Sequence, residues 1–423
     1  MTEAPRVFVS GARRSRLVAV RTDAAIAVAA AVLIGLIVSY VSLLASGALS
    51  IQQSDFLAYY AAGKLLLHGS TQIYSLPAVS SAERLMLGRL RLKDGGLPYL
   101  YPPYFAIALS PLARLPYSSA FAAWLAVNCA LLGITLRALQ RLVSISGRAA
   151  VLFWVASASF LPVFLAATQG QVSILLLTAL TMSLVALRAG HEGIAGAALA
   201  LATVKPFYLP VFLLLLAIRG HYRALLSFAG GSAALLVAGA PAGGLNSVVA
   251  YGRQVQLASH WHALFGFAPQ RNQSLSGAFT LSLPSGISSV AWLVTAILIT
   301  GVFVRLAWRS RQLELSWALA TVAALLISPH VFVHDLTILL LPVAIAPAGG
   351  APRSLRALLV FGYVAVIAGQ RLLFVAPIQL AVLAMVAFAI WLALSLNQVP
   401  HSRRRGRAIT LVDRGTPMVG VGT

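Results

Sequence analysis

Long apolar runs, separated by short basic or polar segments, dominate the pattern along the 423-residue chain. Most of these runs have the length that a helix needs to cross about 30 Å of hydrocarbon. We therefore expect an all-α fold, a polytopic transmembrane bundle of about twelve helices. The expected spans are residues 24–46, 117–138, 149–168, 171–188, 193–204, 207–218, 224–240, 288–308, 314–328, 331–347, 356–370 and 372–396.

Two short runs, 193–204 and 207–218, flank the dipeptide Lys205-Pro206. They form either a hairpin of half-spanning helices or one helix kinked at Pro206. The charges that follow favour the hairpin, because a single helix would move the arginines of the later loops to alternating sides.

The distribution of basic residues predicts the orientation. With the N-terminus in the cytoplasm, cytoplasmic segments carry 21 of the 31 Lys and Arg residues, and the opposite side carries 10. Positive residues in short loops mark the cytoplasmic side. We expect a cytoplasmic basic N-terminus (1–23), one transmembrane domain (24–397) in the plasma (inner) membrane, and a cytoplasmic, disordered basic tail (398–423). Loops 47–116 and 241–287 are then extracytoplasmic and carry short amphipathic helices.

Composition supports a membrane protein and limits the possible partners. Hydrophobic residues make up 60% of the chain and charged residues 9%, whereas soluble domains carry about 25% charged residues. The net charge of +22 arises from short loops between apolar runs, so we expect the lipid bilayer as a partner and no nucleic acid. The single cysteine, Cys129, allows neither an internal disulfide nor a thiolate metal cluster.

Asp55 is the first candidate for chemistry, because the whole chain has nine Asp and Glu residues and this one follows the first apolar run. It could serve as a general base that takes a proton from an attacking hydroxyl. The alternative is a helix cap for the segment that follows. Tyr59 and Tyr60 could pack against a sugar or a lipid headgroup, or they belong to an interfacial aromatic belt.

Other polar residues fall on the same predicted side of the membrane, where polar groups are costly and mark functional sites. They are Gln169, Gln171, Lys205, Arg271, Asn272, His330, His334, Asp335, Gln370 and Arg371. Their convergence on one face predicts a single cavity there.

Lys205 stands alone between two short apolar runs, and a buried lysine without a partner is expensive. A phosphate would satisfy its charge, unless the side chain reaches the interface instead. Arg271 is a second candidate contact for a phosphate. Gln169 and Gln171 could hold sugar hydroxyls or simply form a polar turn between two spans.

His330 and His334 would share one helix face, next to Asp335. Two histidines and one carboxylate are weak evidence for a metal site. Hydrogen bonds to a phosphate or to Asp55 are the favoured role, and a structural role is the remaining alternative. The chain has no Gly-rich phosphate loop and no cytoplasmic domain for a nucleotide-sugar, so a membrane-carried donor fits better.

In order and spacing, short motifs of this chain resemble glycosyltransferase family 87, integral-membrane enzymes of the GT-C architecture that use polyprenyl-phosphate sugars. The resemblance covers roughly residues 50–345. The motifs are Ser54-Asp55-Phe56 with Tyr59-Tyr60-Ala61, Leu67-His68-Gly69, Ile73-Tyr74, Tyr101-Pro102-Pro103, Trp124 with Asn128, Gly170-Gln171-Val172, Lys205-Pro206, Asn272-Gln273-Ser274 and Ser328-Pro329 with His334-Asp335.

The resemblance implies that Asp55 is the catalytic base, that the donor is polyprenyl-phosphate-mannose, and that the anomeric carbon is inverted without an essential metal. We therefore expect a hexosyltransferase without a cofactor, acting at the extracytoplasmic face on a lipid or glycan acceptor. Expected donor-phosphate contacts are Lys205, Arg271, His330 and His334. Expected sugar or acceptor contacts are Tyr59, Tyr60, Gln169, Gln171, Asn272 and Asp335.

The alternatives are a polytopic transporter or lipid flippase, which would use Asp55 and Lys205 as a charge pair, and a GT-C-like glycan ligase. Transporters usually show internal repeats and midplane polar residues. Neither feature is visible in this chain.

Overall fold

The computed structural model describes residues 54–397 apart from 88–91, 93, 259, 262–263, 350 and 373–377, together with 34–35, 38–39 and 42. Within these residues every regular element is a helix and no strand occurs, which confirms the all-α fold. The expected N-terminus 1–23, most of the first span 24–46, and the tail 398–423 lie outside the described residues.

Three helices of the described part are long and apolar enough to cross a membrane: α5 (Tyr117–Leu142), α14 (Ser285–Arg309) and α18 (Leu380–Asn397). A fourth span is possible if α6 (Gly147–Ala158) and α7 (Leu161–Thr168), bent by 51°, count as one. The bend coincides with Pro162 in the first turn of α7, where a residue without an N–H suits the start of a new helix. The expected count of about twelve spans is therefore not confirmed.

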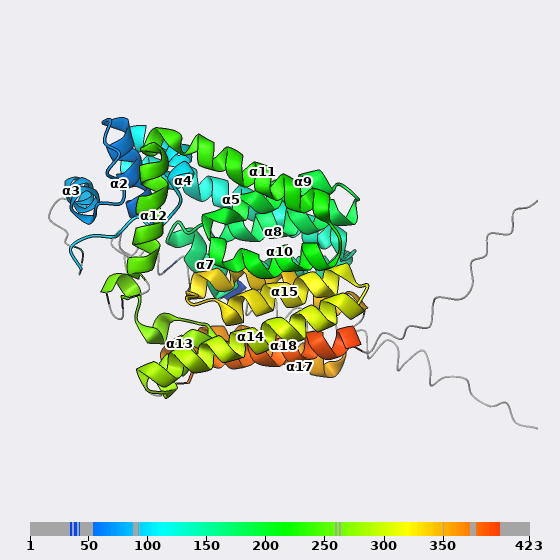
Figure 1. Ribbon diagram of the computed structural model, residues 1–423. Helices are drawn as coiled ribbons and strands as arrows, with labels where there is room; N and C mark the ends of the chain where they lie inside the picture. The colour runs from blue at the N-terminus through cyan, green and yellow to red at the C-terminus, as the bar shows by residue number, and fades with distance from the viewer. Residues whose placement is uncertain are drawn as a thin grey trace, which may run out of the picture.

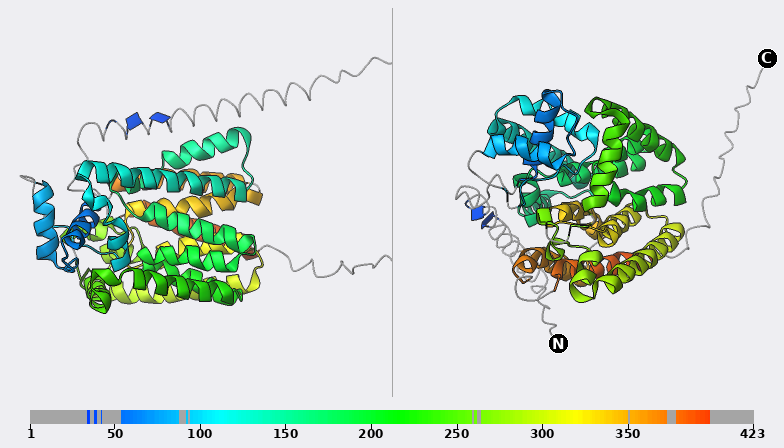
Figure 2. Two further views of the ribbon diagram at one scale, coloured as in Figure 1. Left: turned by 90° about the horizontal axis from the view of Figure 1, so that it is seen from above. Right: turned by 60° about the vertical axis from the view of Figure 1, so that its left-hand side comes forward.

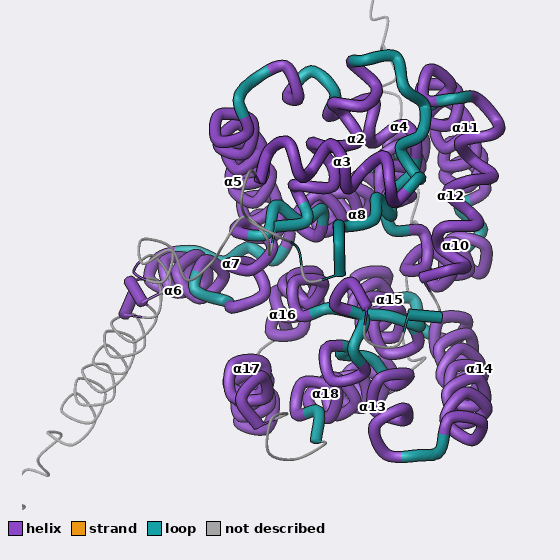
Figure 3. The backbone as a smooth tube through the Cα atoms, turned by 90° about the vertical axis from the view of Figure 1, so that its left-hand side faces the viewer, coloured by secondary structure: helices purple, strands orange, loops and turns teal. Residues whose placement is uncertain are grey.

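Shorter apolar helices occupy the other expected segments of the described chain. They are α8 (Ser173–Arg188), α9 (Glu192–Ala200) with η3 (Leu201–Val204), η4 (Pro206–Tyr208) with α10 (Leu209–Ile218), α11 (Tyr222–Ala238), α15 (Leu313–Ile327), and η8 (Val333–Leu339) with α16 (Leu340–Ile345) and η9 (Ala346–Gly349). Helix α17 (Arg353–Leu372) precedes α18. The long helices run roughly parallel to one another (Figure 1) and are seen nearly end-on in Figure 3.

The segment around Lys205 is a hairpin. His221 follows α10, and its Nδ1 lies 2.8 Å from Oε1 of Glu192, the first residue of α9. The start of α9 and the end of α10 therefore lie together, and Lys205 lies at the turn between them. The structure thus confirms the hairpin and excludes a single kinked helix.

The two predicted extracytoplasmic loops are largely helical. The first holds α2 (Phe56–Leu67), α3 (Leu76–Leu87), α4 (Pro103–Leu109) and η2 (Leu112–Arg114). The second holds η5 (Ala240–Ala242), α12 (Gly244–Ala258), η6 (Leu264–Gly266), η7 (Pro269–Arg271) and α13 (Leu275–Ser282). Helices α2, α3 and α12 gather at one end of the bundle, and α12 crosses the direction of the long helices (Figure 1). The left panel of Figure 2 shows the same end of the bundle from above.

Two hydrophobic cores hold these parts together. The larger is built from the long and short apolar helices and includes Trp317 and Phe212. The smaller is aromatic and packs α2 against α4 and α5, with Tyr59, Tyr101 and Trp124 among its members. The end of the bundle that meets the aromatic core carries most of the polar residues singled out by the sequence.

The opposite end of the bundle carries polar contacts between segments that were predicted to be cytoplasmic. Arg188, at the end of α8, lies 2.5 Å from Glu314 in the first turn of α15. Arg219 donates a hydrogen bond of 2.8 Å to Ser316. Helix α8 spans about 24 Å at 1.5 Å per residue, so Gln171 before its start and Arg188 at its end belong to opposite ends of the molecule.

Candidate functional site

Asp55 occupies the residue before α2, and its side chain does not cap that helix. Instead, the backbone around it is tied to a distant turn. The Phe56 amide donates to the Gln169 carbonyl at 3.3 Å, and the Ser54 hydroxyl donates to the same carbonyl at 3.2 Å. The capping alternative is therefore excluded, and the carboxylate of Asp55 is available for other contacts.

That turn, Gln169-Gly170-Gln171, joins α7 to α8 and is shaped by Gly170. The residue has φ +67°, and a Cβ atom there would approach Cβ of Phe56 to 2.7 Å. Glycine alone combines this backbone conformation with such a close approach. The indole of Trp124 in α5 donates to the Gly170 carbonyl at 2.7 Å. The turn is thus fixed against both α2 and α5.

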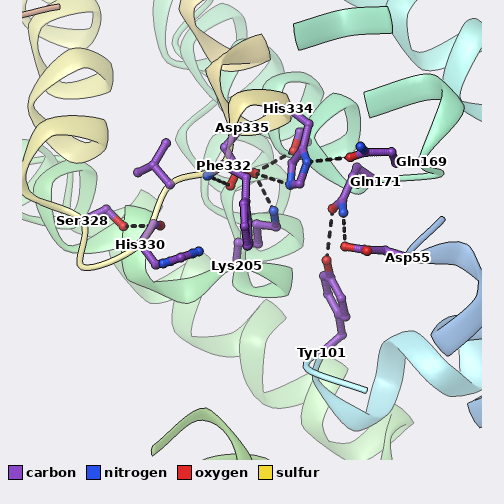
Figure 4. Close-up of polar contacts among 12 residues, drawn as sticks. Asp55, Tyr101, Gln169, Gln171, Lys205, Ser328, His330, Phe332, His334 and Asp335 are labelled. Atoms are coloured by element: carbon purple, nitrogen blue, oxygen red, sulfur yellow. Dashed lines mark hydrogen bonds and ion pairs between the residues drawn. The ribbon is translucent and has the colours of Figure 1, made fainter. Parts of the chain in front are cut away.

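Gln171 connects Asp55 to a buried tyrosine (Figure 4). Its side-chain amide donates a hydrogen bond to Oδ2 of Asp55. Its Oε1 accepts a bond of 3.2 Å from the hydroxyl of Tyr101. Gln171 is completely buried, so both ends of the amide find partners in the protein, as buried polar groups require.

A buried ion pair lies beside this chain of contacts. Nζ of Lys205 lies 2.5 Å from Oδ1 of Asp335, and both side chains are almost fully buried. The Asp335 carboxylate also accepts bonds from the Ser173 hydroxyl at 2.8 Å and the Phe332 amide at 3.1 Å. The expectation that Lys205 is a lone cation was therefore wrong: Asp335, 130 residues away, supplies its countercharge.

His334 links the ion pair to the glutamine turn. Its Nδ1 lies 3.0 Å from Oε1 of Gln169, and its Nε2 lies 3.7 Å from Oδ1 of Asp335. Gln169 therefore faces the ion pair, while Gln171, two residues later, faces Asp55. Figure 4 shows Gln169 beside His334 and Gln171 beside Asp55. The structure thus unites residues from five segments of the chain, around Asp55, Tyr101, Gln171, Lys205 and Asp335.

The pKa of Asp55 reflects this setting. Burial raises it from 3.8 to about 6, and Asp335 raises it as well, whereas the nearby charge of Lys205 and the bond from Gln171 lower it. Removal of a carboxylate from water disfavours its charged form. Asp55 is therefore ionised above about pH 6, with a proton affinity well above that of an ordinary aspartate.

Asn272 ties the second long loop to the segment that carries His330. Its Nδ2 donates to the Pro329 carbonyl at 2.9 Å, and its Oδ1 accepts from the Val331 amide at 2.9 Å. The ring of His330 packs against those of Phe267 and Phe332, with centroids 4.4 and 4.3 Å away. The side chain of Asn272 thus fixes the second long loop to the backbone on both sides of His330.

Two other expected site residues, Tyr60 and Arg271, lie apart from the contacts around Asp55, whereas Tyr59 packs against Tyr101 and its amide donates to the Asp55 carbonyl at 3.4 Å. Tyr59 is buried in the aromatic core, with its ring centroid 4.7 Å from that of Tyr101. The Tyr60 hydroxyl donates to the Leu115 carbonyl at 2.6 Å. Arg271 is exposed at the end of η7. Their roles toward sugar, acceptor or phosphate stay predictions.

Sequence reasoning missed two members of the site, Tyr101 and Ser173. Tyr101 was visible as part of the motif Tyr101-Pro102-Pro103, but no role was expected for its hydroxyl. Ser173 gave no signal at all, because a serine at the start of an apolar helix is ordinary. Among the described residues, no three His, Cys, Asp or Glu side chains are grouped so that they could hold a metal ion.

Comparison with known proteins identifies one family. The model of glycosyltransferase family 87 matches residues 99–329, more than half of the chain. No curated protein and no solved structure matches. The matched segment contains Gln171 and Lys205, whereas Asp55 and Asp335 lie outside it. The structure nevertheless bonds each of these two carboxylates to a side chain inside the match.

Proposed function

Because the chain belongs to glycosyltransferase family 87, we propose that it transfers a hexose, mannose, from a polyprenyl-phosphate sugar to a hydroxyl of a lipid or glycan acceptor. Asp55 is the general base of this proposal. The family makes the chain a glycosyltransferase; the donor, the sugar, the acceptor and the side of the membrane belong to the proposal.

The observation that carries the proposal is the position of Asp55. Its carboxylate receives a bond from Gln171 within range of the Lys205 charge, and its pKa of about 6 suits a group that must be ionised at neutral pH and still accept a proton. Asp335, the other carboxylate of this site, is already engaged by Lys205, Ser173 and the Phe332 amide. Asp55 is therefore the better candidate for proton transfer.

The proposed step balances in atoms and charge. The acceptor oxygen attacks the anomeric carbon from the face opposite the phosphate, while its proton passes to the Asp55 carboxylate. The bond between the anomeric carbon and the phosphate oxygen breaks, and the lipid phosphate leaves with the electron pair. One displacement of this kind inverts the anomeric configuration. The Asp55 proton then returns to water before the next turnover.

The leaving phosphate gathers negative charge, and fixed positive charge near it lowers the barrier. Lys205 fits this role, because an ammonium has three N–H donors and its bond to Asp335 uses one of them. Burial lowers the pKa of His330 to about 4, so this ring would contribute hydrogen bonds rather than charge. His334 and the exposed Arg271 complete the proposed set of phosphate contacts.

Sugar and acceptor contacts are proposed from Gln169, Gln171, Asn272, Asp335, Tyr59 and Tyr60. In the structure the polar atoms of Gln171 and Asn272 bond to the protein itself, so their proposed influence on the substrate is through the shape of the site. No cofactor has a part in the proposed reaction.

We place the site at the extracytoplasmic face of the plasma membrane, with both termini in the cytoplasm. The support is the separation of the two ends of the bundle. Arg188, Arg219 and Arg223 lie at the end opposite Asp55, as the preference of basic residues for cytoplasmic loops requires.

The test is transfer by the purified protein in detergent from radiolabelled polyprenyl-phosphate-mannose, with lipid and glycan extracts of the source cells as acceptors. We expect a labelled product from the lipid-linked donor and none from a nucleotide-linked donor of the same sugar. Transfer from the nucleotide sugar, or none from any polyprenyl-phosphate hexose, would contradict the proposal. A transporter or flippase would show no transfer in detergent, where sealed compartments are absent.

A further inference from the structure

A general base must present one particular oxygen to its substrate, and the side chain of an aspartate can rotate. The backbone of Asp55 is fixed by the bonds of its neighbours to Gln169. Its carboxylate is held by Gln171, whose amide donates to Oδ2. A primary amide, however, can present either its NH₂ group or its oxygen to a neighbour. Something must decide which end faces Asp55.

The ionised carboxylate, which can only accept, favours the amide nitrogen, and Tyr101 supports that orientation by holding the amide oxygen at the other end. The Tyr101 hydroxyl donates to Oε1 of Gln171 at 3.2 Å, which leaves the amide nitrogen to face the carboxylate. The reverse orientation would set two oxygen atoms against each other. The Tyr101 ring is buried, and its centroid lies 5.6 Å from that of Phe105. The Tyr101 carbonyl accepts a bond of 2.7 Å from the Tyr74 hydroxyl, and Pro102 follows directly. Both the ring and the backbone of Tyr101 are thus held in place by their neighbours.

We propose that Tyr101 is a positioning residue that acts on Asp55 through Gln171, so that Oδ2 of the carboxylate is occupied and Oδ1 takes the acceptor proton. The inference rests on the proposed role of Asp55 as the base. It assigns to Tyr101 a role that requires its hydroxyl, beyond the reversal of the chain at Pro102-Pro103.

This relay, in which Tyr101 acts on Asp55 through Gln171, predicts a measurable change in the ionisation of Asp55. The bond from Gln171 lowers the pKa of Asp55, so its loss raises the pH at which the carboxylate ionises. Because hydrogen bonds to charged groups have substantial net strength, Gln171→Met should move the midpoint upward by about one pH unit. Tyr101→Phe removes one oxygen atom and frees the amide to rotate. We expect an upward shift of about half a pH unit.

Infrared titration of the protonated carboxyl band measures this midpoint without any substrate, with Asp55→Asn as the reference spectrum. Few other carboxyl groups compete, since the chain has nine Asp and Glu residues. In the double variant Gln171→Met/Tyr101→Phe the midpoint should equal that of Gln171→Met alone, because residues acting in series are not additive. The acid limb of the transfer rate should move in the same direction.

The matched control is Tyr99→Phe. Tyr99 is also buried, and its hydroxyl donates to the Pro102 carbonyl at 3.1 Å rather than to Gln171. Its removal should leave the Asp55 midpoint at about pH 6. If Tyr101→Phe leaves the midpoint unchanged, or if Tyr99→Phe moves it equally, the relay is wrong. If Asp55→Asn transfers sugar normally while the infrared shifts occur, the relay stands and the proposed role of Asp55 as the base fails.

Discussion

Lys205 and Asp335 form a buried ion pair. Their atoms lie 2.5 Å apart with little exposure to solvent. A buried pair of this kind has a small net effect on stability, because the cost of removing both charges from water offsets their attraction. The loss of one partner is different, since the other charge then stays buried without compensation. The pair as a whole therefore adds little stability, whereas the loss of either partner is costly.

The double substitution Lys205→Met/Asp335→Leu separates these effects. Each single substitution should destabilise the protein by about 3–5 kcal/mol, whereas the double variant should recover most of the loss. Thermal unfolding in detergent measures this. If Lys205 also serves the leaving phosphate, the double variant will be stable and still transfer sugar at least about 100-fold more slowly. A stable double variant with normal transfer would remove Lys205 from the mechanism.

Helices α9 and α11 cross at Gly196. A Cβ atom at this position would lie 2.1 Å from the carbonyl oxygen of Ala224 and 2.7 Å from the amide nitrogen of Phe228. Backbone atoms cannot move aside as a flexible side chain can. Small residues at such crossings let helices approach closely in membranes. The crossing packs α9, the first helix of the hairpin with Lys205 at its turn, against α11.

Gly196→Ala should therefore destabilise the protein by about 1–3 kcal/mol, because the two helices must move apart. Gly230→Ala is the matched control: Gly230 lies within α11, and a Cβ there would meet nothing within 4 Å. The control should unfold at the temperature of the unmodified protein or slightly above it. Equal melting temperatures for both variants would show that the crossing is looser than the structure indicates.

Element positions were predicted well wherever one long apolar run makes one helix. The expected span 117–138 is α5 (Tyr117–Leu142), and 288–308 is α14 (Ser285–Arg309). Side-chain partners were harder, because contacts such as Lys205 with Asp335 join residues that no local pattern connects. The predicted topology placed the polar residues on one side of the membrane. It did not predict that Gln169 bonds to His334 while Gln171 bonds to Asp55. Tyr101 was recognised as part of a motif with Pro102 and Pro103, and no contact of its hydroxyl was predicted.

At the scale of the molecule, two ends with different chemistry define the protein. One end carries Arg188, Glu192 and Arg219, at the ends of α8, α9 and α10. The other carries helices α2, α3 and α12 of the two long loops (Figures 1 and 3). Asp55, directly before α2, and the Lys205–Asp335 pair belong to this end. A donor whose lipid lies in the bilayer can present its phosphate sugar at the second end without a soluble domain to bind it.

Thiol labelling tests which end faces the cell exterior. Cys129→Ser provides a background without cysteine, since Cys129 is the single cysteine of the chain. Leu85→Cys then marks α3, where Leu85 is 88% exposed, and His191→Cys marks the exposed turn before α9. A membrane-impermeant maleimide should label the Leu85→Cys variant in intact cells, and the His191→Cys variant after permeabilisation alone. The opposite pattern would place the site in the cytoplasm.

The most direct test of the account is sugar transfer by Asp55→Asn and Asp55→Ala, compared with the unmodified protein at equal amounts and with a defined polyprenyl-phosphate sugar. Asn keeps the size of the side chain and removes its ability to accept a proton. We predict that both variants fold and that both lose at least about 100-fold in turnover, the contribution expected of a general base. Transfer by both variants at the rate of the unmodified protein would contradict the central claim.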